Sequence, residues 1–268
     1  MKEKLKLGVV PYLNVLPLLR GLGADFPERN WIRATPRELA PLLAEGRVDV
    51  AALSTFEAIR CGYAIVPGVM IGADGPVRSV MLYSRVPLAE IRTVLLDRAS
   101  LSSTHLAQIL AAELLRISPV YTTSEAPLRA EDIALTESQD AVLVIGDTAL
   151  RWEGKFPHAL DLAAGWKELT GLPFVFAAWL VRDGLSLTRE QVAAFIRARE
   201  CGERDGAILA REASADPANA GIRDLHDYFT RAIRHRLGER ELEGLRLYRR
   251  KLIAHQFIDN AAPEIKLV

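Results

Sequence analysis

The sequence predicts an α/β protein with two lobes and a ligand cleft between them. Near the N-terminus, apolar strands alternate with helical segments, a pattern typical of a parallel sheet with right-handed crossovers. Two long extended segments, 77–84 and 174–181, each separate one α/β series from the next. We expect these segments to be adjacent strands that cross between the lobes. Polar residues follow several strands at their carboxyl ends, where open α/β sheets bind ligands.

The composition excludes several classes of protein. Half of the 268 residues are hydrophobic, and the 34 basic and 34 acidic residues cancel, so no net field favours nucleic acid or an anionic membrane. No apolar run reaches the roughly 18 residues of a membrane helix, and the run before Pro11 is too short for a signal peptide. Cys61 and Cys201 are far apart and show no metal-ligand spacing. We therefore expect a cytoplasmic protein without a zinc site or a disulfide scaffold.

The first lobe is expected to combine residues 1–84 with residues 178–268, and the second to hold residues 85–177. The clearest helix start is Thr35-Pro36-Arg37-Glu38, which joins an N-cap, a first-turn proline and the glutamate of a capping box. We predict strands at 6–10, 30–34, 48–53, 64–66, 69–71, 93–96, 119–123 and 140–145, and helices from the hydroxyls at 100–104 to residue 115 and at 148–150, 190–199, 207–213, 225–237 and 239–255.

The C-terminal helices have arginine-rich faces, which we expect to face solvent. His226, His235 and His255 lie on these helices without the spacing of metal ligands. We therefore expect all three histidines at the surface.

Asn14 is the first candidate site residue. It follows the first strand in the stretch Pro11-Tyr12-Leu13-Asn14, where a side chain can meet a ligand. Asn is also a favoured N-cap, and Pro17 suits a first helical turn, so capping is the alternative. Ser54 ends another predicted strand and has the same two interpretations, cap or ligand contact.

Further hydroxyls stand at the predicted helix start 100–104. Free backbone N–H groups and the helix dipole at such a start suit a carboxylate, and the sequence has no glycine-rich phosphate loop; simple capping is again the alternative. Gly146 and Asp147 follow the strand 140–145, and Asp147 can cap the next helix or face the cleft. The positions expected to converge on one interlobe cleft are Asn14, Ser54, Ser79, Ser100 to Ser103, Gly146 and Asp147.

Four stretches carry a family resemblance: Pro11-Tyr12-Leu13-Asn14 with Leu16-Pro17-Leu18, Asp74-Gly75-Pro76-Val77 with Ser79, Leu143-Val144-Ile145-Gly146-Asp147, and Trp166-Lys167 through Thr170-Gly171-Leu172-Pro173-Phe174-Val175-Phe176-Ala177. From about residue 6 to residue 182, the sequence resembles the chorismate dehydratases of the futalosine route to menaquinone. This family has the type II periplasmic-binding-protein fold. One departure is Leu101, where the family usually has an arginine, so backbone N–H groups and the neighbouring serines remain to hold an anion.

The resemblance implies removal of water from chorismate to give 3-[(1-carboxyvinyl)oxy]benzoate, without a metal or a cofactor and without a nucleic-acid or membrane partner. The ring loses its C3 proton and its C4 hydroxyl and becomes aromatic. His105, Asp147 or the enolpyruvyl carboxylate of the substrate itself can take the proton. The expected catalytic residues are Asn14 and Ser79, and the expected substrate-binding residues are Tyr12, Ser54, Ser100, Ser102, Ser103, Gly146 and Asp147.

Two other functions fit the same fold. A solute receptor would bind a small carboxylate without chemistry, although the expected lack of a signal peptide argues against export. The later enzyme of the pathway, which forms dihydroxynaphthoate, has a Ser-Pro-type turn in place of Pro-Tyr-Leu-Asn.

Overall fold

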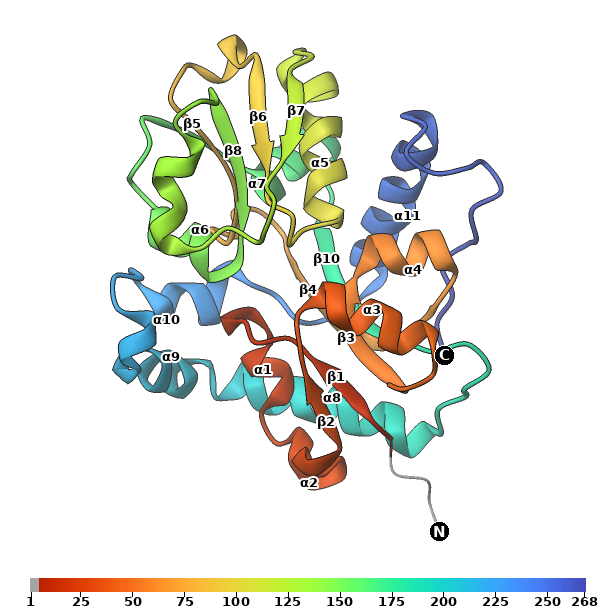
Figure 1. Ribbon diagram of the computed structural model, residues 1–268. Coiled ribbons are helices and arrows are strands. Elements are labelled where there is room, and N and C mark those ends of the chain that lie inside the picture. The colour runs from red at the N-terminus through yellow and green to blue at the C-terminus, as the bar shows by residue number, and fades with distance from the viewer. Residues whose placement is uncertain (1–4) are drawn as a thin grey trace.

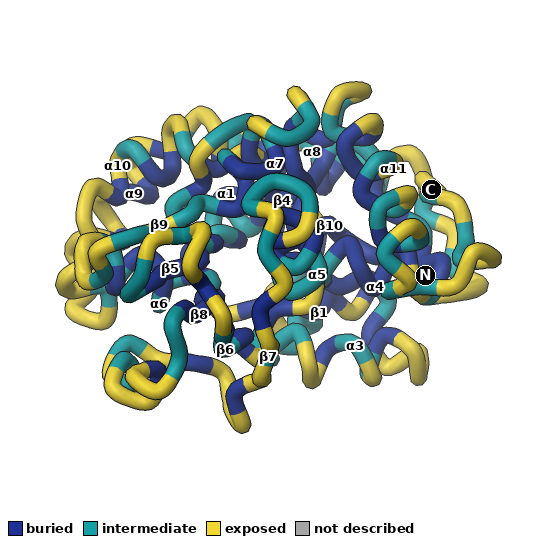
Figure 2. The backbone as a smooth tube through the Cα atoms, turned by 90° about the horizontal axis from the view of Figure 1, so that it is seen from above, coloured by how far each residue is buried: buried dark blue, intermediate teal, exposed yellow. Residues whose placement is uncertain are grey.

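A computed structural model describes residues 5–268 and consists of two lobes, each built on a five-stranded sheet (Figure 1). The strand order is β2-β1-β3-β10-β4 in the first sheet and β7-β6-β8-β5-β9 in the second. Buried segments form the interior of both lobes, and the exposed positions gather in the outer loops and helices (Figure 2). The predicted two-lobed α/β architecture is confirmed. Residues 1–4, the start of the segment considered for a signal peptide, lie outside the described residues.

The first sheet begins as the alternating pattern predicts, because β1 pairs in parallel with both β2 and β3. β10 then runs antiparallel between β3 and β4. The two runs predicted at 64–66 and 69–71 form one strand, β4, whose register with β10 shifts twice. The strands of this sheet are β1 (Leu7–Val9), β2 (Trp31–Arg33), β3 (Val50–Ser54), β4 (Ala64–Ala73) and β10 (Phe174–Val181).

Short helices follow β1, and longer ones come from the C-terminal third of the chain. α8 packs on β4 and on α1, and α11 packs on β10. A Cβ at Gly202 of α8 would lie 2.0 Å from the carbonyl oxygen of Pro17, so only glycine allows this close approach. The helices are α1 (Leu16–Leu19), α2 (Leu22–Asp25), α3 (Pro36–Ala44), α4 (Thr55–Cys61), α8 (Arg189–Arg204), α9 (Gly206–Ala215), α10 (Leu225–Asp227) and α11 (Glu239–Ala254), with 3-10 turns at Leu13–Val15, Glu28–Asn30 and Pro217–Asn219.

In the second sheet β6 lies parallel to β7 and β8, and β5 lies antiparallel between β8 and β9. The predicted strands at 93–96, 119–123 and 140–145 are confirmed. The elements are β5 (Val80–Ser84), β6 (Thr93–Leu96), β7 (Val120–Thr123), β8 (Ala141–Ile145), β9 (His158–Asp161), α5 (Ser102–Leu110) with its π-helical continuation Ala111–Leu115, α6 (Gly146–Trp152), α7 (Leu162–Thr170), and 3-10 turns at Leu88–Glu90 and Ala130–Thr136.

The prediction that segments 77–84 and 174–181 are adjacent crossing strands is wrong. β5 belongs to the second sheet and β10 to the first, and the chain passes between the lobes just before each of them, at 74–79 and 171–173. The expected lobe boundary after residue 84 therefore comes too late, and the one after residue 177 falls inside β10. Both sheets are built from similar apolar strands, so the local pattern does not say which sheet a strand joins.

Hydrogen bonds from the end of β9 hold the first crossing in place. Asp161 Oδ2 accepts the N–H groups of Val77 (2.8 Å) and Arg78 (2.6 Å), while its Oδ1 caps the start of α7. Lys167 of α7 forms an ion pair with Asp74 in the same crossing. These contacts hold the crossing against the second lobe.

The C-terminal segment departs from the predicted helix 225–237. After α10 it forms a π-helical turn, Tyr228–Ala232, and then an extended stretch in which Arg234 pairs with Gly72 beside β4. His235 follows, and it is buried with 2% of its surface exposed. The expectation of a surface position is therefore wrong for His235, because the edge of β4 takes a backbone partner here. His255 is half-buried against Glu113, and only His226 is exposed as expected.

Candidate active site

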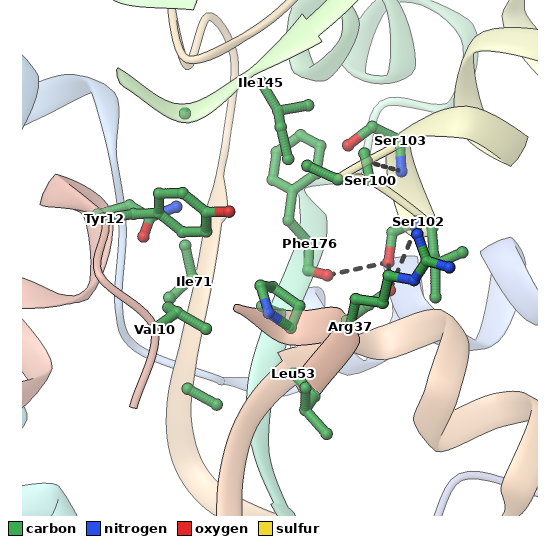
Figure 3. Close-up of a pocket in the computed structure, with 18 of the residues that line it drawn as sticks. Val10, Tyr12, Arg37, Leu53, Ile71, Ser100, Ser102, Ser103, Ile145 and Phe176 are labelled. Atoms are coloured by element: carbon green, nitrogen blue, oxygen red, sulfur yellow. Dashed lines mark hydrogen bonds between the residues drawn. The ribbon is translucent and has the colours of Figure 1, made fainter. Parts of the chain in front are cut away.

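A cavity of about 460 Å³ lies between the lobes. Its wall comes from the loop after β1, the start of α3, the end of β3, the first crossing, the start of α5, the end of β8 and the middle of β10 (Figure 3). The structure brings together every predicted site residue except Asp147, namely Tyr12, Asn14, Ser54, Ser79, Ser100, Ser102, Ser103 and Gly146.

Asn14 lies in the 3-10 turn Leu13–Val15 and does not cap a helix. The N-cap positions of this turn and of α1 are Tyr12 and Val15, and neither element has a side-chain cap from any residue between 5 and 268. The Asn14 Oδ1 atom is buried and lacks a hydrogen-bond partner within that same range. The capping alternative is therefore wrong for Asn14, and its amide is left for another partner.

The C-terminal segment contacts Asn14 and Ser79, the two expected catalytic residues. His235 Nε2 hydrogen bonds with the backbone oxygen of Asn14, and the buried Tyr228 hydroxyl lies beside Ser79. Ser79 is itself 2% exposed, and its carbonyl oxygen accepts the N–H of Gly146 at 2.7 Å. Sequence reasoning missed both residues, because the predicted helix 225–237 placed His235 at the surface and gave no reason to single out Tyr228.

Ser54 and Ser102 join three chain segments at the lobe boundary. Their hydroxyl oxygens lie 2.5 Å apart, and Ser102 Oγ donates to the carbonyl oxygen of Phe176 at 3.0 Å (Figure 3). Ser54 Oγ also accepts the N–H of Phe56, which confirms that Ser54 caps α4. These two hydroxyls are therefore largely occupied by internal contacts.

Ser100 and Ser103 differ in whether their hydroxyl groups already take part in hydrogen bonds. Ser100 Oγ accepts the N–H of Ser103 at 3.2 Å, and the N–H of Ser102 goes to Ser54 Oγ at 3.2 Å. The N–H groups of Ser102 and Ser103, the first two of α5, are thus already paired, contrary to the expectation that they would be open to an anion. Ser103 Oγ makes no hydrogen bond with the described part of the chain and is the free hydroxyl of this group.

Tyr12 and Gly146 face each other across the lobe boundary. A Cβ at Gly146, which has a φ of +62°, would lie 3.7 Å from Tyr12 Cδ1. Burial, followed by the nearby Asp97 and Asp147 carboxylates, raises the pKa of the Tyr12 phenol to about 12. Tyr12 therefore stays protonated and can donate a hydrogen bond at neutral pH.

Asp147 does not line the main cavity but a neighbouring depression that shares Tyr12 with it. Its Oδ1 accepts the N–H of Leu13 at 3.2 Å. Burial raises the pKa of the Asp147 carboxyl, and the Leu13 contact opposes that effect. The observed role of Asp147 is to join α6 of the second lobe to the loop that carries Asn14.

Side chains able to act as a base are scarce on the cavity wall. His105 stacks on Phe56, with ring centroids 4.1 Å apart, and is absent from the lining; burial lowers the pKa of its imidazole. Glu57 is the one carboxylate among the described lining residues, and it accepts a 2.8 Å hydrogen bond from Arg60. Residues 5–268 contain no group of three His, Cys, Asp or Glu side chains placed to hold a metal ion, and none of their helices is long and apolar enough to cross a membrane.

Comparisons with known proteins identify the family of the chain. The sequence model of the VitK2_biosynth family, described as menaquinone biosynthesis, matches residues 5–254. The chain belongs to this menaquinone-biosynthesis family. It is 29% identical over 263 residues to a chorismate dehydratase of Thermus thermophilus, covering 90% of this chain and 93% of the relative, and 26% identical over 249 residues to one of Campylobacter jejuni, covering 90% and 94%.

A solved structure supports the fold of this menaquinone-biosynthesis protein. The periplasmic aliphatic sulphonate binding protein SsuA from Escherichia coli is similar with a TM-score of 0.61 and 14% identity, over 98% of this chain and 96% of that one. The expected periplasmic-binding-protein-like fold is confirmed.

Sequence reasoning on this family member missed much of the apolar and cationic wall. Ile71, Ile145 and Phe176 form apolar surface against which a ring can pack, and Arg37 brings positive charge (Figure 3). Arg98 adds a second guanidinium to the wall. The position of Arg37 beside a well-defined N-cap was an available signal, since the start of a helix after a parallel strand lies at the cleft edge of the sheet.

Proposed function

We propose that this protein is a chorismate dehydratase that forms 3-[(1-carboxyvinyl)oxy]benzoate for menaquinone biosynthesis by the futalosine route, in the cytoplasm. The family membership supports the pathway, and the two relatives named chorismate dehydratase support the reaction. The observation that carries the proposal is the Asn14 amide, which lies on the cavity wall without a partner among residues 5–268.

The proposed reaction needs a site that holds a dianion and favours loss of the C3 proton. Conjugation with the ring carboxylate makes this proton acidic, and aromatisation drives loss of the C4 hydroxyl as water. Fixed donors that meet the developing negative charge lower the barrier. In the proposal the Asn14 amide, which donates and accepts, orients the C4 hydroxyl, and Ser79 and Tyr12 offer hydroxyl donors from the same wall.

We assign the proton acceptor to the enolpyruvyl carboxylate of the substrate. Three observations favour this choice over a side chain: His105 is packed outside the cavity, Asp147 accepts the Leu13 N–H, and Glu57 is engaged by Arg60. The apolar patch of Ile71, Ile145 and Phe176 suits the ring and excludes water from it.

The test is incubation of the purified protein with chorismate. Loss of the diene absorbance, with formation of 3-[(1-carboxyvinyl)oxy]benzoate identified by NMR, is the expected result. Binding of chorismate without turnover would instead make the protein a carboxylate receptor of the same fold. Absence of both binding and turnover would overturn the assignment of chorismate.

A further inference from the structure

One guanidinium on the cavity wall has no partner among the residues that the structure describes. Arg37 lies in the first turn of α3 and lines the cavity, and its side chain makes no hydrogen bond or ion pair with residues 5–268. Arg98, also on the wall, donates from Nη1 to the carbonyl oxygen of Glu125 at 3.2 Å. In Figure 3 the Arg37 side chain extends from α3 towards the side of the cavity that holds Ser102.

The position of Arg37 does not serve the stability of α3. A cation in the first turn of a helix faces the positive end of the helix dipole, which disfavours it. The adjacent Glu38 makes no ion pair with Arg37; its Oε2 accepts instead from N and Oγ1 of Thr35, at 2.8 and 2.7 Å. At this position the positive charge of Arg37 slightly disfavours the helix, and the side chain lines the cavity.

The residues at the start of α5, on the same side of the cavity, provide no positive charge for a bound carboxylate. Leu101, 41% exposed, has no charge to offer. The N–H groups of Ser102 and Ser103 are bonded within the protein, and so is the Ser102 hydroxyl. On the side of the cavity that holds Ser102, Arg37 thus offers a free guanidinium, whose planar fork matches a carboxylate with two parallel hydrogen bonds.

We propose that Arg37 binds one carboxylate of the substrate and selects for a dicarboxylate. The identity of that dicarboxylate as chorismate rests on the proposed function, but the recognition of a carboxylate does not require turnover. The free hydroxyl of Ser103 supports the same group from α5. The role is in binding, so loss of Arg37 raises KM more than it lowers kcat.

The experiment measures equilibrium binding of 3-(carboxymethoxy)benzoate, a stable dicarboxylate, by calorimetry. The variants are Arg37→Gln, Arg37→Lys, Arg98→Gln and the control Arg47→Gln. Arg47 lies beyond the other end of α3, is exposed and, among residues 5–268, forms an ion pair only with Glu45, so its loss changes the net charge equally. Arg37→Gln should weaken Kd by about tenfold or more, the size of one charge-assisted hydrogen bond. Arg37→Lys should fall between it and the wild type, and Arg47→Gln should match the wild type.

Two further measurements test whether Arg37 acts in binding or in stabilising the fold. The melting temperature of Arg37→Gln should equal or exceed that of the wild type, because a cation leaves the helix N-terminus. The weakening of binding by salt should be smaller in Arg37→Gln than in Arg47→Gln.

Equal Kd values for Arg37→Gln and Arg47→Gln would overturn the inference, as would a loss confined to Arg98→Gln or a wild-type protein that fails to bind the dicarboxylate. A wild type that binds it through Arg37 but does not dehydrate chorismate would overturn the proposed function and leave this inference standing.

Discussion

His235 Nε2 lies 3.0 Å from the backbone carbonyl oxygen of Asn14, although 221 positions separate the two residues in the chain. A carbonyl oxygen only accepts, so Nε2 carries the hydrogen and the imidazole is held in one tautomer. Burial lowers the pKa of His235 to about 4, and the nearby Arg199 adds to the effect. The neutral imidazole of a C-terminal residue thus fixes the loop that presents the Asn14 amide.

Replacement of His235 should disturb turnover through Asn14. His235→Ala removes the donor, so kcat should fall by about tenfold to a hundredfold, the scale of a misplaced active-site group. His235→Gln keeps an N–H that can reach the same oxygen and should recover much of the loss, with KM for chorismate little changed in both. Equal kcat values for the two variants, with a shared fall in melting temperature only, would reduce His235 to a packing residue.

The same histidine predicts how stability depends on pH. Its pKa is 6.5 ordinarily and about 4 in the folded protein. Between these values the unfolded chain binds more protons than the folded one, so the free energy of unfolding falls as the pH drops through this window. In urea denaturation, the free energy of unfolding of the wild type should fall relative to that of His235→Gln as the pH drops from 6.5 to about 4. Parallel pH profiles would contradict the assignment.

Asn14→Ala should separate catalysis from folding. No helix cap is lost, so the melting temperature should stay close to that of the wild type. Dehydration of chorismate should fall by about a hundredfold or more, as when one transition-state donor is removed. Asn30→Ala is the matched control, since Asn30 also has a buried, unpaired amide atom but lies outside the cavity lining. Wild-type turnover in Asn14→Ala would end the catalytic assignment.

Ser102→Ala and Ser103→Ala should have different effects. Ser102→Ala breaks the contacts with Ser54 and Phe176 and should lower the free energy of unfolding by about 1–3 kcal/mol. Ser103→Ala removes a free hydroxyl, so stability should hold while KM for chorismate rises. Denaturant titration and steady-state kinetics on both variants check this, and a reversed pattern would contradict the division of roles.

Gly202→Ala should destabilise the packing of α8 against α1, the helix that follows the Asn14 turn. The new Cβ would lie 2.0 Å from the Pro17 oxygen, so α8 or α1 must shift, at a cost of about 1–3 kcal/mol in the free energy of unfolding. Gly23→Ala serves as the control, because the nearest atom to its Cβ is Glu28 Cγ at 3.5 Å. Similar melting temperatures for the two variants would show that the contact relaxes without cost.

Features that depend on neighbours along the chain could be predicted from the sequence. The Thr35 and Glu38 capping box forms as expected, with the Thr35 N–H donating to Glu38 Oε2 at 2.8 Å. The parallel pairing of β1 with β2 and β3 follows from short alternating segments. These elements need contacts only within a few residues or with the next strand in order, so their patterns are visible locally.

The sheets to which β5 and β10 belong could not be predicted from local patterns. Their apolar patterns are alike, and the choice of partner depends on pairing with strands far away in the chain. The same holds for Asp147, whose local sequence suits a cap or a ligand contact but whose observed partner is the Leu13 N–H.

The sequence by itself determined the family, the two-lobed α/β class and the chain segments that meet at the cleft, because motifs, caps and strand ends are local. Only the tertiary structure decided which polar atoms in that cleft remain unpaired. The hydroxyls of Ser54 and Ser102 are hydrogen bonded to each other, and His235 is buried beside the edge of β4. The Asn14 side-chain amide and the Arg37 guanidinium have no partner among the described residues. Hydrogen-bond pairing between distant segments sets this outcome, and no spacing along the chain encodes it.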